Sequence, residues 1–215
     1  MHKNLTELVF ILDRSGSMSG LEADTIGGFN AMIDKQKKEE GEALVSTVLF
    51  STDREMIHDR VNLQDIRPLT DKEYYVRGCT ALLDAVGHTI RHIGNVHKYA
   101  REEDRPARTL FIITTDGMEN ASREYTYRKL QELITRQKEQ HGWEFLFLGA
   151  NIDAAAEAKR FGIAPECAAN YHADSLGTAT IFEAVDDAVC QFRAARPMTA
   201  AWKRRVDSDY QKRKK

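Results

Sequence analysis

The sequence has 215 residues, of which 42% are hydrophobic and 30% are charged, and its formal net charge is −2. This balance excludes a chain that is disordered throughout, and the length suits one α/β domain with a buried sheet. A net charge so close to zero provides no global field that favours nucleic acid as a partner, so nucleic-acid binding is not expected.

The chain begins with polar residues, and its first apolar run, residues 8–12, ends at Asp13. This run is too short to span a bilayer, and the residues before it carry no signal-peptide pattern. The three cysteines, Cys79, Cys167 and Cys190, form no CxxC motif and no paired framework, which suits a reducing compartment. We therefore expect a cytoplasmic protein that makes no contact with membranes.

Three continuous apolar runs, at residues 8–12, 110–113 and 145–148, predict central β-strands. Runs without polar alternation are typical of parallel strands whose two faces are both covered by helices. Residues 44–51 predict a fourth strand. Residues 55–63 follow it so closely that the two are expected to form a hairpin, which leaves one antiparallel strand at the sheet edge.

Helices are expected between these strands. Ser19 and Glu22 are spaced as in a capping box, which predicts a helix that starts after Ser19 and stops near Gly41. Gly27 and Gly28 weaken this helix, and we interpret the pair as a place where it lies close to the sheet. Helical spacing predicts four more helices, at residues 81–99, 124–141, 153–160 and 178–193.

The alternation of strands and helices predicts a Rossmann-like α/β fold, with a mostly parallel sheet, one antiparallel edge strand and helices on both faces. We assign residues 1–196 to this domain. Residues 197–215 are polar and basic, and we treat them as a C-terminal extension that is either a loose tail or a helix docked on the domain.

Five oxygen-bearing side chains are expected to meet at the carboxyl edge of the sheet, where parallel strands deliver ligand-binding residues. Two of the predicted central strands lead there to an aspartate, and a glycine-containing turn after the first brings two serine hydroxyls to the same point. A threonine before the second predicted helix adds a third hydroxyl. The predicted metal ligands are Asp13, Ser15, Ser17, Thr80 and Asp116.

Two carboxylates and three hydroxyls form an all-oxygen ligand set, which suits Mg²⁺ or Mn²⁺ at about 2.0–2.2 Å and offers no soft ligand to select zinc. The two aspartates neutralise the ion, and the hydroxyls add no charge. If one aspartate acts through water, the ion keeps net positive charge and one open coordination position. Free amides at two nearby helix starts would also favour an anion. We therefore predict that a protein partner supplies an Asp or Glu to the metal.

These residues resemble the metal-ion-dependent adhesion site of von Willebrand factor A domains. Residues 13–17 (DRSGS) resemble the DxSxS element of that family. Residues 78–80 (GCT) resemble its second element, whose threonine contacts the metal, and residues 115–117 (TDG) resemble its third element, whose aspartate completes the site. The three elements occur in the family's order, and the similarity covers most of the chain.

The resemblance implies a Rossmann-like sheet with one antiparallel strand, Mg²⁺ or Mn²⁺ binding, and protein–protein interaction through an acidic side chain of the partner, without enzymatic activity. The chain is more similar to the intracellular bacterial-type members, which serve as adaptors in multiprotein machines, than to the secreted adhesive members.

Several polar residues near the predicted ligands have plainer interpretations. We expect Arg14 to be a solvated side chain and Glu119 to be an acid at a helix start. Asn120 and Asn151 are candidates for the rim of the site, and Asp153 is expected to cap the next helix.

His88 and His92 are four residues apart on a predicted helix, a spacing that can chelate zinc. No third ligand is evident, so an exposed pair is expected. Cys79 adjoins Thr80 and is expected to be a packing residue rather than a redox centre.

Two alternatives to an interaction module remain open. An enzyme could use Asp13 as a phosphoryl acceptor assisted by Mg²⁺, although Ser15 stands where a haloacid-dehalogenase-type site has a second aspartate. A structural scaffold could carry the same site in vestigial form. Turnover abolished by Asp13→Asn would favour the enzyme, and absence of Mg²⁺ or Mn²⁺ uptake would favour the scaffold.

Overall fold

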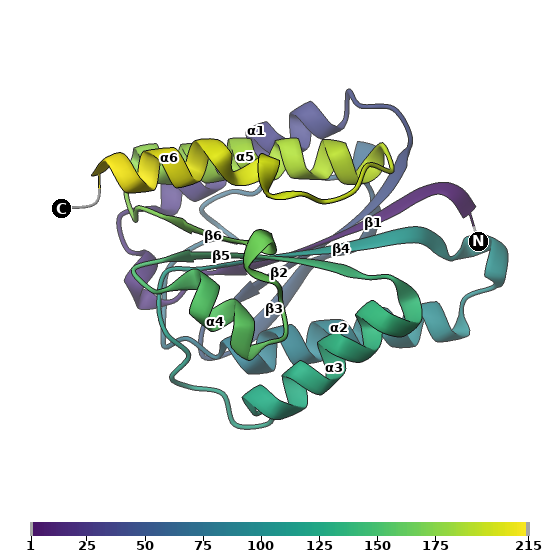
Figure 1. Ribbon diagram of the computed structural model, residues 1–215, viewed down its shortest axis with the longest axis horizontal. Helices are drawn as coiled ribbons and strands as arrows, with labels where there is room; N and C mark the ends of the chain where they lie inside the picture. Colours follow the sequence, from purple (N-terminus) through teal and green to yellow (C-terminus); the bar gives the residue numbers. More distant parts are fainter. Residues whose placement is uncertain (1, 214–215) are drawn as a thin grey trace.

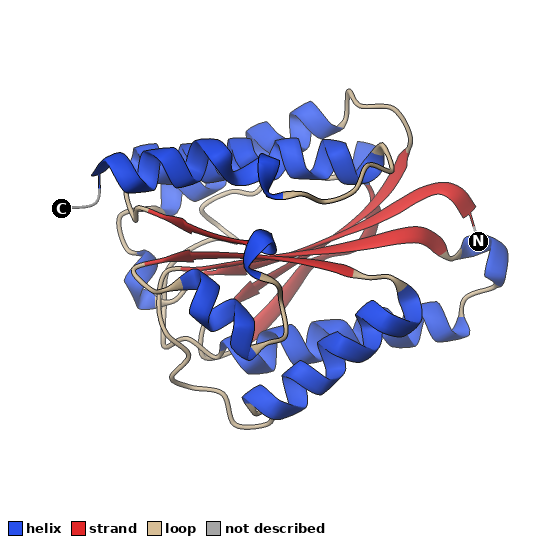
Figure 2. Ribbon diagram, viewed as in Figure 1, coloured by secondary structure: helices blue, strands red, loops and turns tan. Residues whose placement is uncertain are grey.

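A six-stranded sheet forms the centre of the molecule, and helices cover both of its faces in the computed structural model, which describes residues 2–213 (Figures 1 and 2). The strand order is β3-β2-β1-β4-β5-β6, and β3 alone is antiparallel to its neighbour. The strands are β1 (His2–Asp13), β2 (Glu42–Phe50), β3 (Arg54–Asn62), β4 (Pro106–Thr115), β5 (Glu144–Ala150) and β6 (Ala168–Tyr171).

Two apolar layers hold the helices on the sheet. Along β1, Leu8, Phe10 and Leu12 belong to one layer, and Val9 and Ile11 belong to the other, because successive side chains of a strand point to opposite faces. Figure 1 shows α1, α5 and α6 over one face and α2, α3 and α4 over the other. The helices are α1 (Glu22–Gln36), α2 (Leu82–Tyr99), α3 (Tyr127–His141), α4 (Ala154–Arg160), α5 (Ser175–Arg193) and α6 (Arg204–Arg213).

The predicted fold class is confirmed, including the antiparallel strand β3 at the sheet edge. The prediction missed β6, which has only four residues, Ala168–Tyr171, and therefore no apolar run. Among the described helices, none is both long and apolar enough to cross a membrane.

The predicted capping box at Ser19 is wrong. The α1 helix begins at Glu22 after Leu21, and the Glu22 carboxylate accepts a hydrogen bond from Gly20 N at 2.7 Å. The reason is that Ser19 terminates a short 3-10 turn, Gly16–Met18, instead of starting the helix. Gly41 also does not end α1, which stops at Gln36; with φ at +91°, Gly41 makes the turn into β2.

The glycine pair in α1 marks a close approach to a helix, not to the sheet. A Cβ atom on Gly28 would lie 2.4 Å from Phe182 Cδ2 of α5, whereas a Cβ atom on Gly27 would meet nothing within 4 Å. Gly28 therefore allows α1 and α5 to lie against each other.

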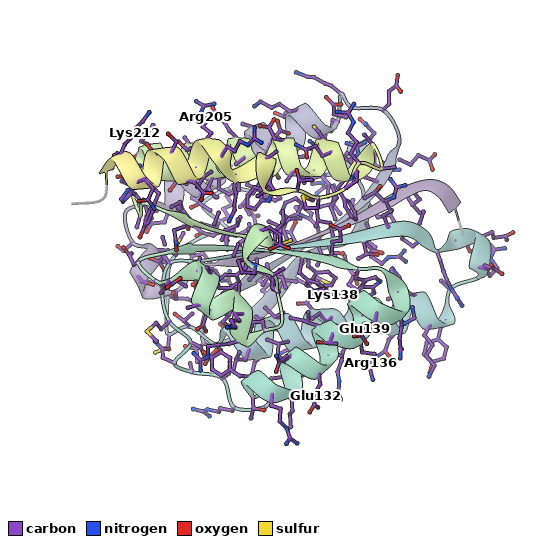
Figure 3. The ribbon with its side chains drawn as sticks, in the orientation of Figure 1. Glu132, Arg136, Lys138, Glu139, Arg205 and Lys212 are labelled. Carbon is purple, nitrogen blue, oxygen red and sulfur yellow. The ribbon has the colours of Figure 1, made fainter. Side chains whose placement is uncertain are left out.

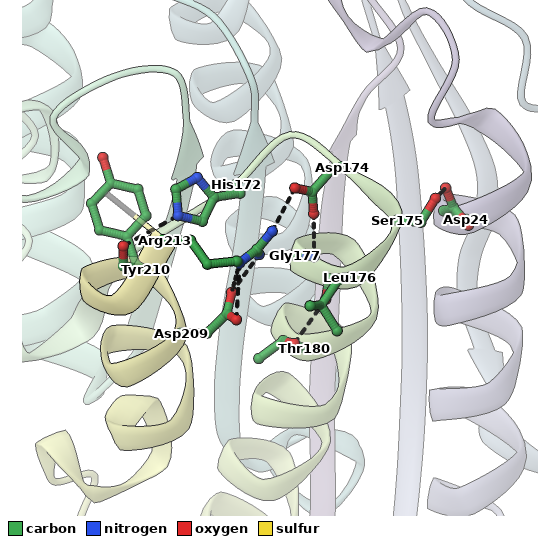
Figure 4. A network of polar contacts seen from close by, with 10 residues as sticks. All are labelled: Asp24, His172, Asp174, Ser175, Leu176, Gly177, Thr180, Asp209, Tyr210 and Arg213. Atoms are coloured by element: carbon green, nitrogen blue, oxygen red, sulfur yellow. Dashed lines mark hydrogen bonds and ion pairs between the residues drawn. The ribbon is translucent and has the colours of Figure 1, made fainter. Parts of the chain in front are cut away.

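The segment after residue 196 docks on the domain, as one of the two alternatives expected. Trp202 and Val206 are 2% and 1% exposed, and Trp202 Nε1 donates to the Glu166 carbonyl oxygen at 3.1 Å. Near the end of α6, Arg213 pairs with Asp209 and with Asp174, the N-cap residue of α5 (Figure 4). The division of the chain at residue 197 stays a prediction.

Candidate metal centre

The carboxyl ends of β1 and β4 bring two aspartates together. These strands are parallel neighbours in register from Thr6–Arg108 to Leu12–Thr114, so the residues that follow emerge side by side. Asp13 is fully buried and Asp116 is 2% exposed. The sheet topology therefore places two carboxylates beneath the protein surface, where a charged group is costly unless it is compensated.

Hydrogen bonds join the predicted ligands into one cluster. The Ser17 hydroxyl donates to Asp116 Oδ1 at 2.5 Å and lies 3.0 Å from the Ser15 hydroxyl. The Thr80 hydroxyl donates to Ser15 Oγ at 3.1 Å. Asp13 Oδ1 accepts from the backbone N–H of Ser15 at 2.7 Å, which links the fifth residue to the others.

One carboxylate oxygen in this cluster has no donor. Asp116 Oδ2 is buried and accepts no hydrogen bond from the described residues. Buried carboxylate oxygens are almost always compensated, and a divalent cation is one way of doing so. Since the neighbouring groups are hydroxyl and carboxylate oxygens, the residues present fit a hard cation.

Gly117 lies beside two of the predicted ligands. A Cβ atom at this position would lie 3.4 Å from Ser17 Oγ and 3.7 Å from Thr80 Oγ1. Ser17 is exposed, so the cluster faces solvent on that side. Among the five predicted ligands, Ser17 alone is exposed, so an ion would reach the cluster from that side.

Burial shifts the acidity of both carboxyls in the same direction. Desolvation raises the pKa of Asp13 to about 6, against the lowering effect of hydrogen bonds from Thr115 and Ser15. Desolvation also raises the pKa of Asp116, and the hydrogen bond from Ser17 opposes it. Without a cation, the site therefore favours protons on its acids, and a bound cation would favour their charged forms.

Thr115 holds the second oxygen of Asp13 and was not identified from the sequence. Its hydroxyl donates to Asp13 Oδ2 at 2.6 Å. Thr115 is the last residue of β4. The parallel pairing of β4 with β1 brings its hydroxyl to Asp13, which is 102 residues away along the chain. Its place one residue before Asp116 was the available signal.

Hydrogen bonds that the sequence did not predict fasten the segment before α2 to the ligand loop, residues 13–17. Tyr74 Oη donates to the Asp13 carbonyl oxygen at 2.5 Å. Backbone bonds of 2.8 Å and 3.0 Å join Arg77 N to Arg14 O and Gly16 N to Gly78 O. These contacts set the position from which Thr80 reaches the cluster.

Comparison with solved structures identifies the fold. Proximal thread matrix protein 1 from the mussel byssus superposes with a TM-score of 0.62 at 16% identity, over 88% of this chain and 47% of that chain. A von Willebrand factor type A structure from Catenulispora acidiphila gives 0.60 at 14% identity, over 87% and 43%. The manganese-loaded Plasmodium vivax TRAP protein gives 0.54 at 15% identity, over 85% and 74%.

The chain has the von Willebrand factor A fold. It spans about half the length of the first two of these chains. No protein-family model matches the sequence, and no curated protein matches it significantly. Among the solved neighbours, the mussel protein has also been described with a zinc-occupied MIDAS motif, the metal-ion-dependent adhesion site.

Within this von Willebrand factor A fold, the expectation for Arg14 is wrong. Its side chain is fully buried and pairs with Glu55 at 2.8 Å, and it donates to the Glu73 carbonyl oxygen at 2.8 Å. Its guanidinium also lies 5.3 Å from the centre of the Tyr75 ring. The partners are 41 and 59 residues away along the chain, so no local pattern could reveal them.

The loop after Asp116 caps α2. Glu119 Oε2 accepts from Leu83 N and Asn120 Oδ1 accepts from Thr80 N, both at 2.9 Å. Glu119 is thus an acid at a helix start, as expected. Because these amides at the start of α2 are taken, they are not free to attract an anion, contrary to the prediction.

The remaining candidates have structural partners. Asp153 caps α4 through Ala156 N at 3.0 Å, as predicted, and Asn151 Nδ2 approaches Asp116 O at 3.5 Å on the rim. His88 and His92 pair separately, with Glu124 and Asp59, both at 2.9 Å. No group of three or more His, Cys, Asp or Glu side chains in residues 2–213 is placed to hold a metal. Cys79 is an exposed free thiol, not the packing residue expected.

Proposed function

We propose that this chain is a divalent-metal-dependent protein–protein interaction module. Asp13, Ser15, Ser17, Thr80 and Asp116 would hold Mg²⁺ or Mn²⁺, and an Asp or Glu of the partner would complete its coordination. The observation that carries the proposal is the convergence of these side chains around Asp116 Oδ2, a buried acceptor without a donor among the described residues.

The charge of the cluster supports recognition of an acid. Two carboxylates offset the ion's charge, and three hydroxyls contribute lone pairs without charge. Asp13 has hydrogen bonds on both carboxylate oxygens, from Ser15 N and Thr115 Oγ1, so it is suited to act through water. The ion would then keep positive character toward the open side at Ser17.

An exposed apolar side chain beside the cluster supports a protein as the partner. Met118, which follows Gly117, is 64% exposed. Exposed large apolar groups next to a polar site are typical of protein-binding surfaces.

We propose no catalytic role for the site. A phosphoryl acceptor needs a carboxylate oxygen that a substrate can reach. Asp13 is fully buried, and hydrogen bonds engage both of its oxygens. The three free cysteines agree with a reducing compartment, and a cytoplasmic location is part of this proposal. The proposed role of the module is that of an adaptor.

Titration calorimetry with Mn²⁺ and Mg²⁺ tests the metal. The wild type should take up one ion, and Asp116→Ala should weaken the affinity by at least about tenfold because it removes a charged ligand. Asp71→Ala, which removes an exposed carboxylate elsewhere, is the control. No uptake by the wild type would leave only the scaffold alternative.

Affinity capture in Mn²⁺ or in chelator tests the interaction. Partners retained in Mn²⁺ should be lost in chelator and with Asp116→Ala, but kept with Asp71→Ala. Added free glutamate should compete, because its carboxylate can occupy the open coordination position. Partners that stay bound in chelator would contradict a metal-dependent module.

A further inference from the structure

A second concave site lies at the opposite end of the sheet from the metal cluster. A cavity of about 960 Å³ opens between α2 and α3 beside the amino end of β4. The five predicted metal ligands lie at the carboxyl end of β4. This end is ten residues from the amino end, or about 30 Å along a strand. The two sites therefore share no residue.

Positive charge is concentrated in this cavity. Five lysine and arginine side chains line it, and the one acid among the lining residues is Glu102; the five are Arg91, Lys98, Arg105, Arg108 and Arg136. Figure 3 shows Arg136 on α3. The whole chain carries a net charge of −2, so the excess of cations is a local feature and not a reflection of composition.

The inner wall is aromatic. Trp143 is 3% exposed, and its ring stacks on Phe111 and meets the edge of His97, with centroids 5.2 Å and 5.3 Å apart. His141 also contacts Trp143 and lines the cavity. Gln137 lines the same wall, is 6% exposed, and has a buried amide oxygen with no hydrogen-bond partner among the described residues.

The acid behind this wall is already compensated. Glu7 is fully buried and contacts His97 Nε2 at 2.5 Å and Arg60 Nε at 2.8 Å. Its carboxylate is therefore engaged by Arg60 and His97, and within residues 2–213 no ion pair joins it to the five lysine and arginine side chains that line the cavity. Arg105 donates to the carbonyl oxygens of Ala100 and Lys98, which are uncharged acceptors and leave its positive charge in place.

We propose that this cavity binds a phosphate-bearing small molecule of nucleotide size. Arginine and lysine side chains are the usual ligands of phosphate groups in proteins. The Gln137 oxygen, which has no partner among the described residues, offers an acceptor for an N–H or O–H of the ligand. The volume lies within the range of small-molecule sites.

ATP in chelator is the first probe, since chelation keeps the nucleotide away from the metal cluster and makes the test independent of the proposed function. Trp202→Phe leaves Trp143 as the one tryptophan of the chain, so its fluorescence reports on the cavity. Calorimetry on the chain with both tryptophans gives the same affinity should Trp202→Phe fold poorly. Inorganic tripolyphosphate separates the contribution of phosphate from that of the ring.

Charge reversal at Lys98→Glu with Arg136→Glu should lower ATP affinity by roughly tenfold or more. Lys38→Glu with Lys159→Glu makes the same change of net charge at exposed lysines outside the cavity and should leave the affinity within about twofold. Absence of saturable binding of both probes at millimolar concentration would overturn the proposal. An equal loss in the control pair would overturn it too, because binding would then follow net charge alone.

Discussion

Arg14 holds the ligand loop from the side opposite to its ligands. Asp13 and Ser15 point into the cluster, and the guanidinium between them in sequence reaches Glu55 and the carbonyl oxygen of Glu73. The same segment that receives Arg14 carries Tyr74, which bonds to Asp13 O. Arg14 thus ties the ligand loop, residues 13–17, to strand β3 and to the segment of the chain that leads to Thr80.

Replacing Arg14 by methionine keeps the length of the stem and removes the guanidinium. We predict a loss of about 1–3 kcal/mol in unfolding free energy, because the Glu73 carbonyl oxygen loses its partner and Glu55 its cation. Urea unfolding measures this change. Arg77→Met removes the exposed pair with Asp53 and should cost about 0–1 kcal/mol, so equal losses in the two variants would contradict the assigned role.

Asp13 makes the metal-free protein sensitive to pH. Its pKa is raised from 3.8 to about 6 by burial, so the folded state binds the proton more tightly than the unfolded state. Stability from this group is therefore full below pH 3.8 and is lost as pH rises toward 6, by on the order of 3 kcal/mol.

Comparing wild type with Asp13→Asn isolates the contribution of the Asp13 carboxyl group to stability, because the asparagine side chain stays neutral at every pH. In chelator, wild type should lose stability relative to Asp13→Asn between about pH 3.8 and pH 6, as measured by urea unfolding at each pH. Identical pH profiles for the two proteins would show that Asp13 does not titrate as described.

Among the secondary-structure elements, α1 and α5 lie against each other at Gly28, and this close contact can be tested by mutation. A Cβ atom on Gly28 would overlap the Phe182 ring, so Gly28→Ala should destabilise the fold by about 1–3 kcal/mol through forced displacement of α5. Gly27→Ala meets nothing within 4 Å and should stabilise the helix by roughly 0.5–1 kcal/mol. Thermal unfolding of both variants measures the difference. Changes of the same sign would rule out the close approach at Gly28.

Elements with a strong local pattern could be predicted from the sequence, and elements defined by pairing could not. The apolar runs identified β1, β4 and β5 because both of their faces are buried, but β6 owes its place to its pairing with β5. Likewise Asp13 and Asp116 could be placed because Asp13 is the last residue of β1 and Asp116 directly follows β4. The bond from Tyr74 to Asp13 spans 61 residues, and no periodicity encodes it.

The docked tail is a feature of the whole molecule, since it joins residues after 196 to β6 and α5. Trp202→Ala should lower the unfolding free energy by about 3–5 kcal/mol because it empties a buried site. Arg205→Ala removes an exposed pair with Glu183 on the same segment and should cost about 0–1 kcal/mol. Denaturant unfolding compares them. Near-equal, small losses would mean that the tail is only loosely attached.

The central claim is that five side chains from three separate stretches of the chain hold one divalent ion. Anomalous diffraction from crystals soaked in Mn²⁺ tests it most directly. We predict a single strong peak among the oxygens of Asp13, Ser15, Ser17, Thr80 and Asp116, next to Asp116 Oδ2. A map with no peak there, or with manganese bound only at other carboxylates, would contradict the claim.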